Sequence, residues 1–370
     1  QMSNAVGGSS ENINSTTVSR SVLDSERVEV MDDDMDEPYR FTPPGCPEDI
    51  RPTSRSSVKR ICRVISKMSE EKREYVKEIG FGGILHLPQL NKIDRSFTVW
   101  LMRKVDCNNR EIIVSDNIQV TMEDKDVHRV LGIPRGKKTV HGLGTNNPEE
   151  KFHFIEHAIG AEEDESRSLL AASINVETDK PGVMTTEDVK HFKVSFVVWL
   201  IGYFLAPTRK CNHGSNDFWG SLLDPDDIVN YNWCKYALDM LVEAARAVQL
   251  DLKTRKTCSY VSGCPLLLQI IYLDNVNLGP LNRPLAVSPC VAGLTCEIMR
   301  KMILAAKATS IGRPNVHNAR RPTPSFQHTS PRQALSDRAN KGKRIENSTP
   351  STPQPVDRIE TACGAEVDKC

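Results

Sequence analysis

The chain has 370 residues, with 48 basic and 48 acidic side chains, so it has no formal net charge, and 39% of its residues are apolar. This length allows one large domain or two modest ones, and zero net charge argues against a protein dedicated to coating nucleic acid. The charge is uneven, because residues 1–50 have eleven acidic and three basic side chains, whereas residues 305–344 have nine basic and one acidic. Both ends are poor in apolar residues. We therefore expect residues 1–50 and 307–370 to be disordered, and residues 51–306 to form the folded domain.

The first elements of this domain are predicted from apolar spacing and turn signals. Residues 69–79 have helical spacing after a serine cap, and Gly80 stands where a left-handed helix end is expected. A second helix is predicted from the apolar spacing that starts at Phe97, and it is expected to end near Cys107. Two short β-branched runs, 111–114 and 118–121, flank a polar turn and predict a hairpin.

Capping signals predict the next two helices. Thr121 with Asp124 is read as a capping box for a helix that ends at Gly132, and Thr185 with Asp188 repeats the signal. The second box precedes the longest apolar run, 194–206, which is too short to span a bilayer of about 20 residues. We expect a buried helix there and no membrane segment.

The longest amphipathic helix is expected to start at the sequence Asp224-Pro225-Asp226-Asp227, an acidic cap followed by proline. Residues 264–273 fit either a helix or a buried strand, and their length favours a helix. The residues expected in the core are Phe196, Trp199, Trp233 and Leu241. The fold class is thus mainly α, an irregular helical domain with one short β-hairpin between disordered termini.

The sharpest chemical motif is His153-Phe154-Ile155-Glu156-His157, an H-x-x-E-H string. On a helix, His153 and His157 would share a face and could bind zinc, with Glu156 polarising a bound water. No second motif supplies a further ligand, so a solvated polar helix is the favoured interpretation and a zinc hydrolase is the less favoured one. No other metal site and no cofactor is predicted.

The eleven cysteines contain no Cys-x-x-Cys pair and indicate reduced thiols in an intracellular protein. We expect them to pack in the core, while a nucleophilic cysteine with a histidine partner stays open. Residues 131–138 superficially resemble a phosphate-binding loop but lack its spacing, so a helix end with an exposed basic turn is expected.

The basic tail contains a cluster formed by Lys341, Lys343 and Arg344, which fits a nuclear-import signal or weak phosphate contacts. We expect a nuclear location, or otherwise a cytoplasmic one. Protein partners are expected, with nucleic acid as a further partner through this tail.

Five strings in order, within about residues 60 to 285, resemble the plant mobile domain, also called aminotransferase-like: EIGFGGIL from Glu78, DVHRVLGIP from Asp126, FLAPT from Phe204, NYNWC from Asn230 and GCPLLLQIIYLD from Gly263. The resemblance is closest to the region that precedes SUMO-protease-like domains in transposon-derived grass genes. It implies a mostly helical, transposon-derived nuclear domain of poorly defined biochemistry, and it does not imply aminotransferase activity.

Two functions follow as expectations. The first is a non-enzymatic nuclear interaction or scaffold domain, with no catalytic residue in this chain. The second is the N-terminal regulatory region of a ubiquitin-like-protein (SUMO) cysteine protease, whose catalytic domain would follow residue 370 in a longer gene product. The late Cys363-Gly364 pair has no scaffold that would make it that catalytic site.

Overall fold

The computed structural model describes residues 52–90, 93–161, 169–179, 182–209, 213–255, 257–283 and 289–310. The predicted disordered segments and the cluster at 341–344 lie outside these ranges, except that residues 307–310 end the last helix. The described α-helices are α2 (Val58–Lys67), α3 (Glu70–Glu78), α4 (Arg95–Arg103), α5 (Asp124–Leu131), α6 (Pro148–Ile159), α7 (Leu169–Glu177), α8 (Thr186–Leu200), α9 (Trp233–Arg255), α10 (Pro265–Asn275) and α11 (Cys296–Ser310). Short helical turns are η2 (Gly82–His86), η3 (Ile201–Leu205), η4 (Trp219–Leu222), η5 (Ile228–Asn230), η6 (Gly279–Leu281) and η7 (Cys290–Gly293). The mainly helical fold class is confirmed.

The predicted hairpin is present and has one more strand than expected. Strands β1 (Val105–Asp106), β2 (Glu111–Ser115) and β3 (Ile118–Thr121) form an antiparallel sheet in that order. Ile112 lies opposite both Val105 and Val120, and all three side chains are buried. One face of this small sheet therefore contributes to the core.

The second predicted helix, expected to end near Cys107, ends earlier, at Arg103, because Val105 belongs to β1. The side-chain amide of Gln249, on α9, donates to the carbonyl oxygens of Met102 (2.8 Å) and Val105 (2.7 Å). Carbonyls at a helix end need such partners. Gln249, which is far from α4 in the sequence, thus stabilises the end of this helix. Local apolar spacing does not reveal such a contact.

Two capping predictions have different outcomes. The Thr185–Asp188 box is confirmed at the start of α8, with both reciprocal hydrogen bonds formed. The Thr121–Asp124 box is wrong, because Thr121 ends β3 and the box of α5 is formed by Glu123 and Asp126. The strand pairing of Thr121 with Glu111 moves the cap two residues onward.

The predicted start of α9 at Asp224 is wrong, since α9 begins at Trp233. Asp226 Oδ1 lies 2.8 Å from Lys193 Nζ, and Asp227 Oδ2 lies 2.5 Å from Lys138 Nζ. These long-range ion pairs use the carboxylates that were expected to cap the helix. Residues 228–230 form η5 instead.

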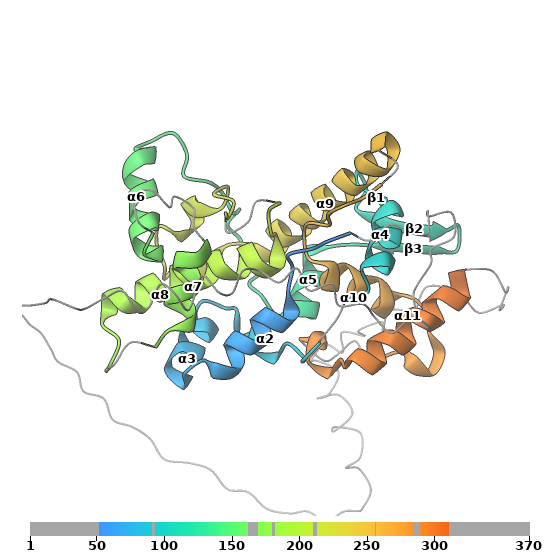
Figure 1. Cartoon of the computed structure of the whole chain (residues 1–370), viewed down its shortest axis with the longest axis horizontal. Coiled ribbons are helices and arrows are strands. Elements are labelled where there is room, and N and C mark those ends of the chain that lie inside the picture. Colours follow the sequence, from blue (N-terminus) through green and yellow to red (C-terminus); the bar gives the residue numbers. More distant parts are fainter. Residues whose placement is uncertain are drawn as a thin grey trace, which may run out of the picture. The chain divides into compact units, whose positions relative to one another are not determined.

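The core is one continuous cluster centred on α8, α9 and α10. Helix α8 packs against α3, α6 and α7, whereas α4 and α5 pack against both α9 and α10 (Figure 1). The predicted core residues Phe196, Trp199, Trp233 and Leu241 are all at most 1% exposed, which confirms them. Residues 264–273 are helical, as favoured. None of the helices in the described ranges combines the length and apolar character that crossing a membrane requires.

Candidate functional site

The three residues of the H-x-x-E-H string lie on α6, where the two histidines meet different neighbours. His153 Nδ1 lies 3.3 Å from Glu156 Oε2. The ring of His157 packs against that of His191 on α8, with 4.9 Å between centroids, and His191 Nε2 lies 3.0 Å from Glu187 Oε1. Within the described ranges, no group of three or more His, Cys, Asp or Glu side chains is placed to hold a metal ion.

The cysteines in the described part of the chain are free thiols, and most of them are buried. Burial raises the pKa of Cys62 to about 11 and that of Cys264 to about 12. Burial, followed by the negative charge of Asp274, raises the pKa of Cys290 to about 12. At neutral pH, only a very small fraction of these thiols is ionised to the thiolate, which is the nucleophilic form.

The basic turn at residues 131–138 is held against the start of α9. The backbone N–H of Gly136 donates to Tyr231 O at 3.1 Å, and Arg135 Nε lies 2.8 Å from Asp124 Oδ1. A side chain at Gly136 would collide with the backbone of Asn230. This loop packs against another part of the chain, so its backbone is not arranged around an open phosphate cradle.

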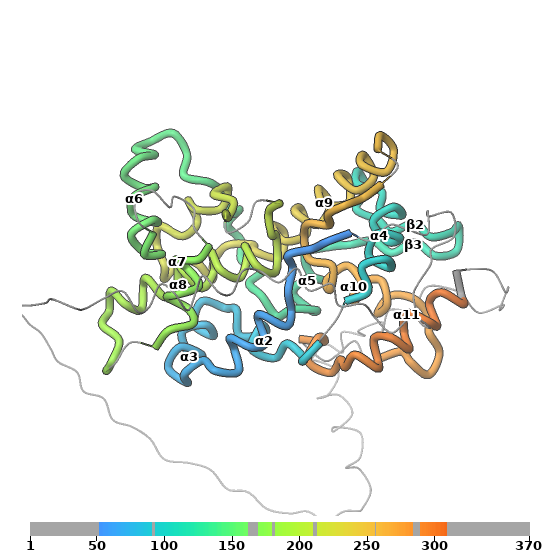
Figure 2. Tube along the Cα trace, viewed as in Figure 1, coloured from blue at the N-terminus to red at the C-terminus, as the bar shows by residue number. Residues whose placement is uncertain are grey.

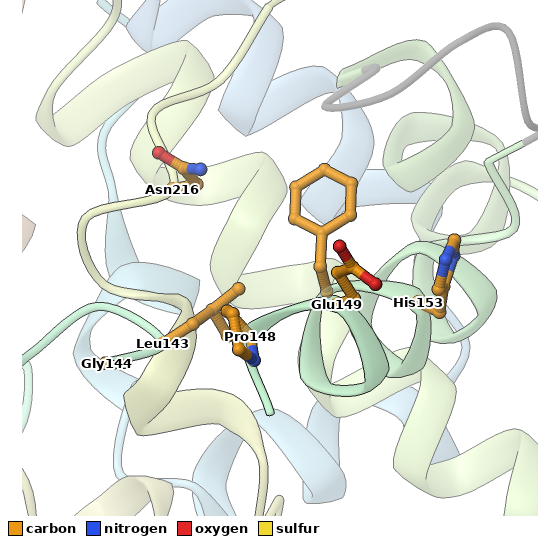
Figure 3. A pocket seen from close by; sticks show the side chains of 7 residues that line it. Leu143, Gly144, Pro148, Glu149, His153 and Asn216 are labelled. Atoms are coloured by element: carbon orange, nitrogen blue, oxygen red, sulfur yellow. The ribbon is translucent and has the colours of Figure 1, made fainter. Parts of the chain in front are cut away.

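A pocket of about 380 Å³ lies beside the first turns of α6, and His153 is one of the residues that line it. Its lining residues are Leu143, Gly144, Pro148, Glu149, Phe152, His153 and Asn216. Figure 3 shows Leu143 next to Pro148, and Glu149 and His153 along the helix, while Asn216 comes from a separate loop. We call this surface the α6 pocket.

The loop wall of the α6 pocket is fixed by close backbone contacts. The backbone N–H of His141 donates to Ser221 Oγ at 2.9 Å, and Lys151 Nζ donates to Leu143 O at 3.4 Å. A Cβ at Gly220 would lie 2.0 Å from Gly142 O, so only glycine allows this approach. The loop before α6 is thus held against η4.

The helical wall is fixed by an aromatic contact and by the helix start. Phe152 packs against the buried ring of Trp219, with 5.1 Å between centroids. Asn147 adopts a left-handed φ of 48° and precedes Pro148, the first residue of α6. Proline is favoured at this position because its fixed φ suits a helix and its missing N–H would be unpaired there.

The polar groups at the rim make the α6 pocket acidic. Glu149 lines it, while Glu150 and Asp217 are exposed on the adjoining residues. The neighbouring cation, Lys151, is half-buried and donates to Leu143 O. The pocket therefore combines an apolar wall with a carboxylate at its edge.

The α6 pocket was not predicted from the sequence. The H-x-x-E-H string at residues 153–157 indicated possible metal binding by this helix, and it did not indicate a pocket. Asn216 and Trp219 are more than sixty residues away from Leu143 and Phe152 along the chain. Only the packing of η4 against α6 brings them together.

The family comparison covers most of the described domain. A family model described as "Domain of unknown function (DUF8566)" matches residues 54–269, which is more than half of the chain. The chain belongs to the DUF8566 family. The match extends from just before α2 into α10 and includes every residue that lines the α6 pocket. No curated protein and no solved structure matches the chain.

Membership of DUF8566 corrects the resemblance to the plant mobile domain, which is wrong as a family assignment. The strings that carried it contain signals that many helical domains share. Gly80 and Gly132 have left-handed φ values of 82° and 61° at helix ends, and Pro265 is the first residue of α10. Such signals report helix boundaries more than ancestry.

Proposed function

We propose that this DUF8566 chain is a non-enzymatic interaction domain, and that its α6 pocket receives a lysine or arginine side chain of a protein partner. The observation that carries the proposal is the pocket lining, in which Leu143, Pro148 and Phe152 provide apolar surface and Glu149 provides a carboxylate. This combination suits a side chain that is apolar along its stem and cationic at its tip.

Lysine and arginine bury their methylene stems along apolar surface while the charged head stays at the edge. Here the stem would lie along Phe152 and Leu143, and the head would meet Glu149. The exposed carboxylates of Glu150 and Asp217 add attraction for a basic segment on approach. An acidic side chain would meet repulsion from the same groups.

The fixed walls of the pocket also support binding. Phe152 is held by Trp219, and the loop carrying Leu143 is tied to η4 through His141 and Ser221. A preformed pocket orders few groups on binding, which lowers the entropic cost of association. Isolated basic side chains bind such surfaces weakly, so we expect an extended segment to bind around the pocket.

The experiment uses the full chain and fluorescein-labelled peptides of equal length that differ at one central residue, which is lysine, arginine, norleucine or glutamate. Fluorescence anisotropy gives the Kd of each peptide. We expect the lysine and arginine peptides to bind best, the norleucine peptide more weakly and the glutamate peptide least. Glu149→Gln should weaken binding of the lysine peptide about three- to fivefold.

The matched control is Glu150→Gln, which removes the same charge from the neighbouring residue outside the pocket lining. It should change the Kd less than Glu149→Gln does. Leu143→Ser should weaken the binding of the lysine peptide and of the norleucine peptide to the same extent. Equal binding of the lysine and glutamate peptides, or equal effects of the two glutamine variants, would refute the proposed pocket ligand.

A further inference from the structure

A second charged surface lies where α9 ends, away from the residues of the α6 pocket. Arg209 Nη2 lies 3.0 Å from Asp251 Oδ2, and Arg255 Nη1 lies 3.9 Å from Asp251 Oδ1. The side chain of Asp251 is 12% exposed, whereas those of Arg209 and Arg255 are 51% and 68% exposed. One buried carboxylate thus pairs with two arginines whose own side chains are mostly exposed to solvent.

A third arginine and an aromatic ring complete this surface. Arg55 Nη1 donates at 3.4 Å to the carbonyl oxygen of Thr208, the residue that directly precedes Arg209. Tyr260 donates its hydroxyl to the same carbonyl at 2.9 Å, and the guanidinium of Arg209 lies 5.9 Å from the centre of its ring. We call Arg55, Arg209 and Arg255 the arginine patch; with Asp251 its net charge is +2.

The described chain begins at the edge of this patch. The backbone N–H of Thr53 donates to Ser259 O at 2.9 Å, and Val261 N–H donates to Thr53 O at 2.8 Å. Thr53 and Tyr260 form a parallel bridge. In Figure 2 the blue start of the described chain accordingly runs beside the gold segment that follows α9.

The residues that precede this point carry the opposite charge. Residues 1–50 have a net charge of −8, and five of the acidic side chains lie in the run Met31-Asp32-Asp33-Asp34-Met35-Asp36-Glu37. Fourteen residues separate Glu37 from Pro52. At full extension they span at most about 50 Å, so the acidic run can reach the patch without leaving its own chain.

We infer that the acidic run of residues 31–37 docks on the arginine patch of the same molecule. Opposite charge supplies the attraction, and attachment at Thr53 makes the contact intramolecular, so weak individual ion pairs act at a high effective concentration. The contact would occupy the solvent-facing N–H groups of Arg209 and Arg255. It is independent of the function proposed for the α6 pocket.

The test incorporates the photo-cross-linker p-benzoylphenylalanine in place of Met35 in the full chain, at a protein concentration low enough to exclude contacts between molecules. Mass spectrometry then locates the cross-links after irradiation. We expect them in peptides that contain residues 53–56, 207–209 and 251–260. Raising the salt from about 0.05 M to about 0.5 M should remove most of them, because exposed charges are then screened.

Two variants and a control test the charge contact. Replacing Asp32, Asp33, Asp34 and Asp36 with Asn should lower the yield of patch cross-links at least about threefold, and Arg255→Gln should lower it by about twofold. Arg246→Gln is the matched control, since Arg246 is on the same helix, is 52% exposed and pairs with Glu243. It should leave the yield unchanged.

Cross-links to the basic residues 311–344, to a second molecule, or to surfaces without arginine would overturn the inference. The same conclusion would follow if the patch cross-links formed equally in Arg255→Gln and Arg246→Gln. Circular dichroism of each variant checks the fold, which we expect to be retained because the side chains of Arg255 and Arg246 are 68% and 52% exposed.

Discussion

Arg129 Nη1 on α5 lies 3.0 Å from Asp274 Oδ2 on α10, and this buried ion pair fastens the later part of the chain to the family-matched domain. Asp274 is 2% exposed. Its other oxygen lies 2.7 Å from Arg283 Nη2, and the thiol of Cys290 donates to Oδ2 at 3.3 Å. Arg283 and Cys290 lie beyond residue 269, where the DUF8566 match ends.

We predict that Asp274→Asn lowers the free energy of unfolding by about 3–5 kcal/mol, because it removes the buried negative charge that faces the partly buried guanidinium groups of Arg129 and Arg283. Denaturant unfolding followed by circular dichroism measures the loss. Glu297→Gln, at an exposed pair with Lys301, is the control and should leave the midpoint unchanged. A loss below about 1 kcal/mol for Asp274→Asn would show that the ion pairs of Asp274 contribute little to the stability of the fold.

Trp233 anchors the start of α9, and its replacement tests the aromatic cluster around it. The ring is fully buried beside Phe81, Phe218 and Tyr236, and its indole N–H donates to Ile228 O at 2.8 Å. Trp233→Ala should cost about 3–5 kcal/mol through the cavity it leaves. Trp233→Phe keeps much of the ring and should cost less. Equal melting temperatures for wild type and Trp233→Ala would contradict this assignment.

Lys72 is a buried lysine whose partners are mainly carbonyl groups. Its Nζ donates to the backbone oxygens of Asn175 (3.2 Å), Val176 (3.2 Å) and Thr178 (2.8 Å), at the end of α7. A cation at this position complements the negative end of the helix. Lys72 also lies 3.1 Å from Asp179, which is largely exposed.

Lys72→Met should therefore destabilise the domain by about 1–3 kcal/mol, because it leaves carbonyl groups near the end of α7 without their donor. Asp179→Asn should have little effect, because an exposed ion pair contributes little. Urea unfolding of both variants compares how much the carbonyl contacts and the ion pair each contribute to the free energy of unfolding. A larger effect of Asp179→Asn than of Lys72→Met would assign the stabilisation to the ion pair instead.

Local signals predicted those parts of the fold that depend on neighbouring residues. Ser69 and Thr185 cap their helices as expected, and Gly80 and Gly132 end theirs, because each signal acts within a few residues. The start of α9 was misplaced because Asp226 pairs with a distant residue. The cap that replaces it is Asn232, whose side chain accepts from Lys235 N–H at 2.8 Å.

The candidate sites were harder to predict for the same reason. The arginine patch joins Arg55, Arg209 and Arg255 through one carbonyl and one carboxylate, and these residues are far apart in sequence. No spacing rule connects them. The α6 pocket likewise depends on glycine at position 220, whose role follows from a backbone contact with Gly142 and not from any motif.

The pair formed by Lys193 and Asp226 predicts how stability depends on pH. Burial lowers the pKa of Lys193, but hydrogen bonds to Asp226 and Glu78 outweigh it and raise this pKa above 10.5. The hydrogen bond from Lys193 lowers the pKa of Asp226 below 3.8. Asp226 therefore stabilises the fold fully above pH 3.8, and this contribution is lost as the pH falls through its lower folded-state pKa.

For Lys193 the sign is opposite: its contribution is complete below pH 10.5 and is lost as the pH rises through its higher folded-state pKa. In Asp226→Asn, the melting temperature should decrease less steeply than in the wild type as the pH falls below about 4. The effect should be small because Asp226 is 73% exposed. Glu243→Gln, at a surface pair on α9, is the control. An unchanged acid slope in Asp226→Asn would contradict the linkage.

Thiol reactivity is expected to distinguish the buried Cys264 from the exposed Cys296. Cys296 is exposed, whereas Cys264 is fully buried with a pKa raised to about 12, so almost none of it is thiolate at neutral pH. We predict that iodoacetamide alkylates Cys296 rapidly in the folded protein and that Cys264 reacts only after unfolding. Mass spectrometry of digests taken over time measures each site. Because a nucleophilic thiol must be accessible and partly ionised, rapid alkylation of Cys264 would reopen a catalytic role, and its protection would support a packing role.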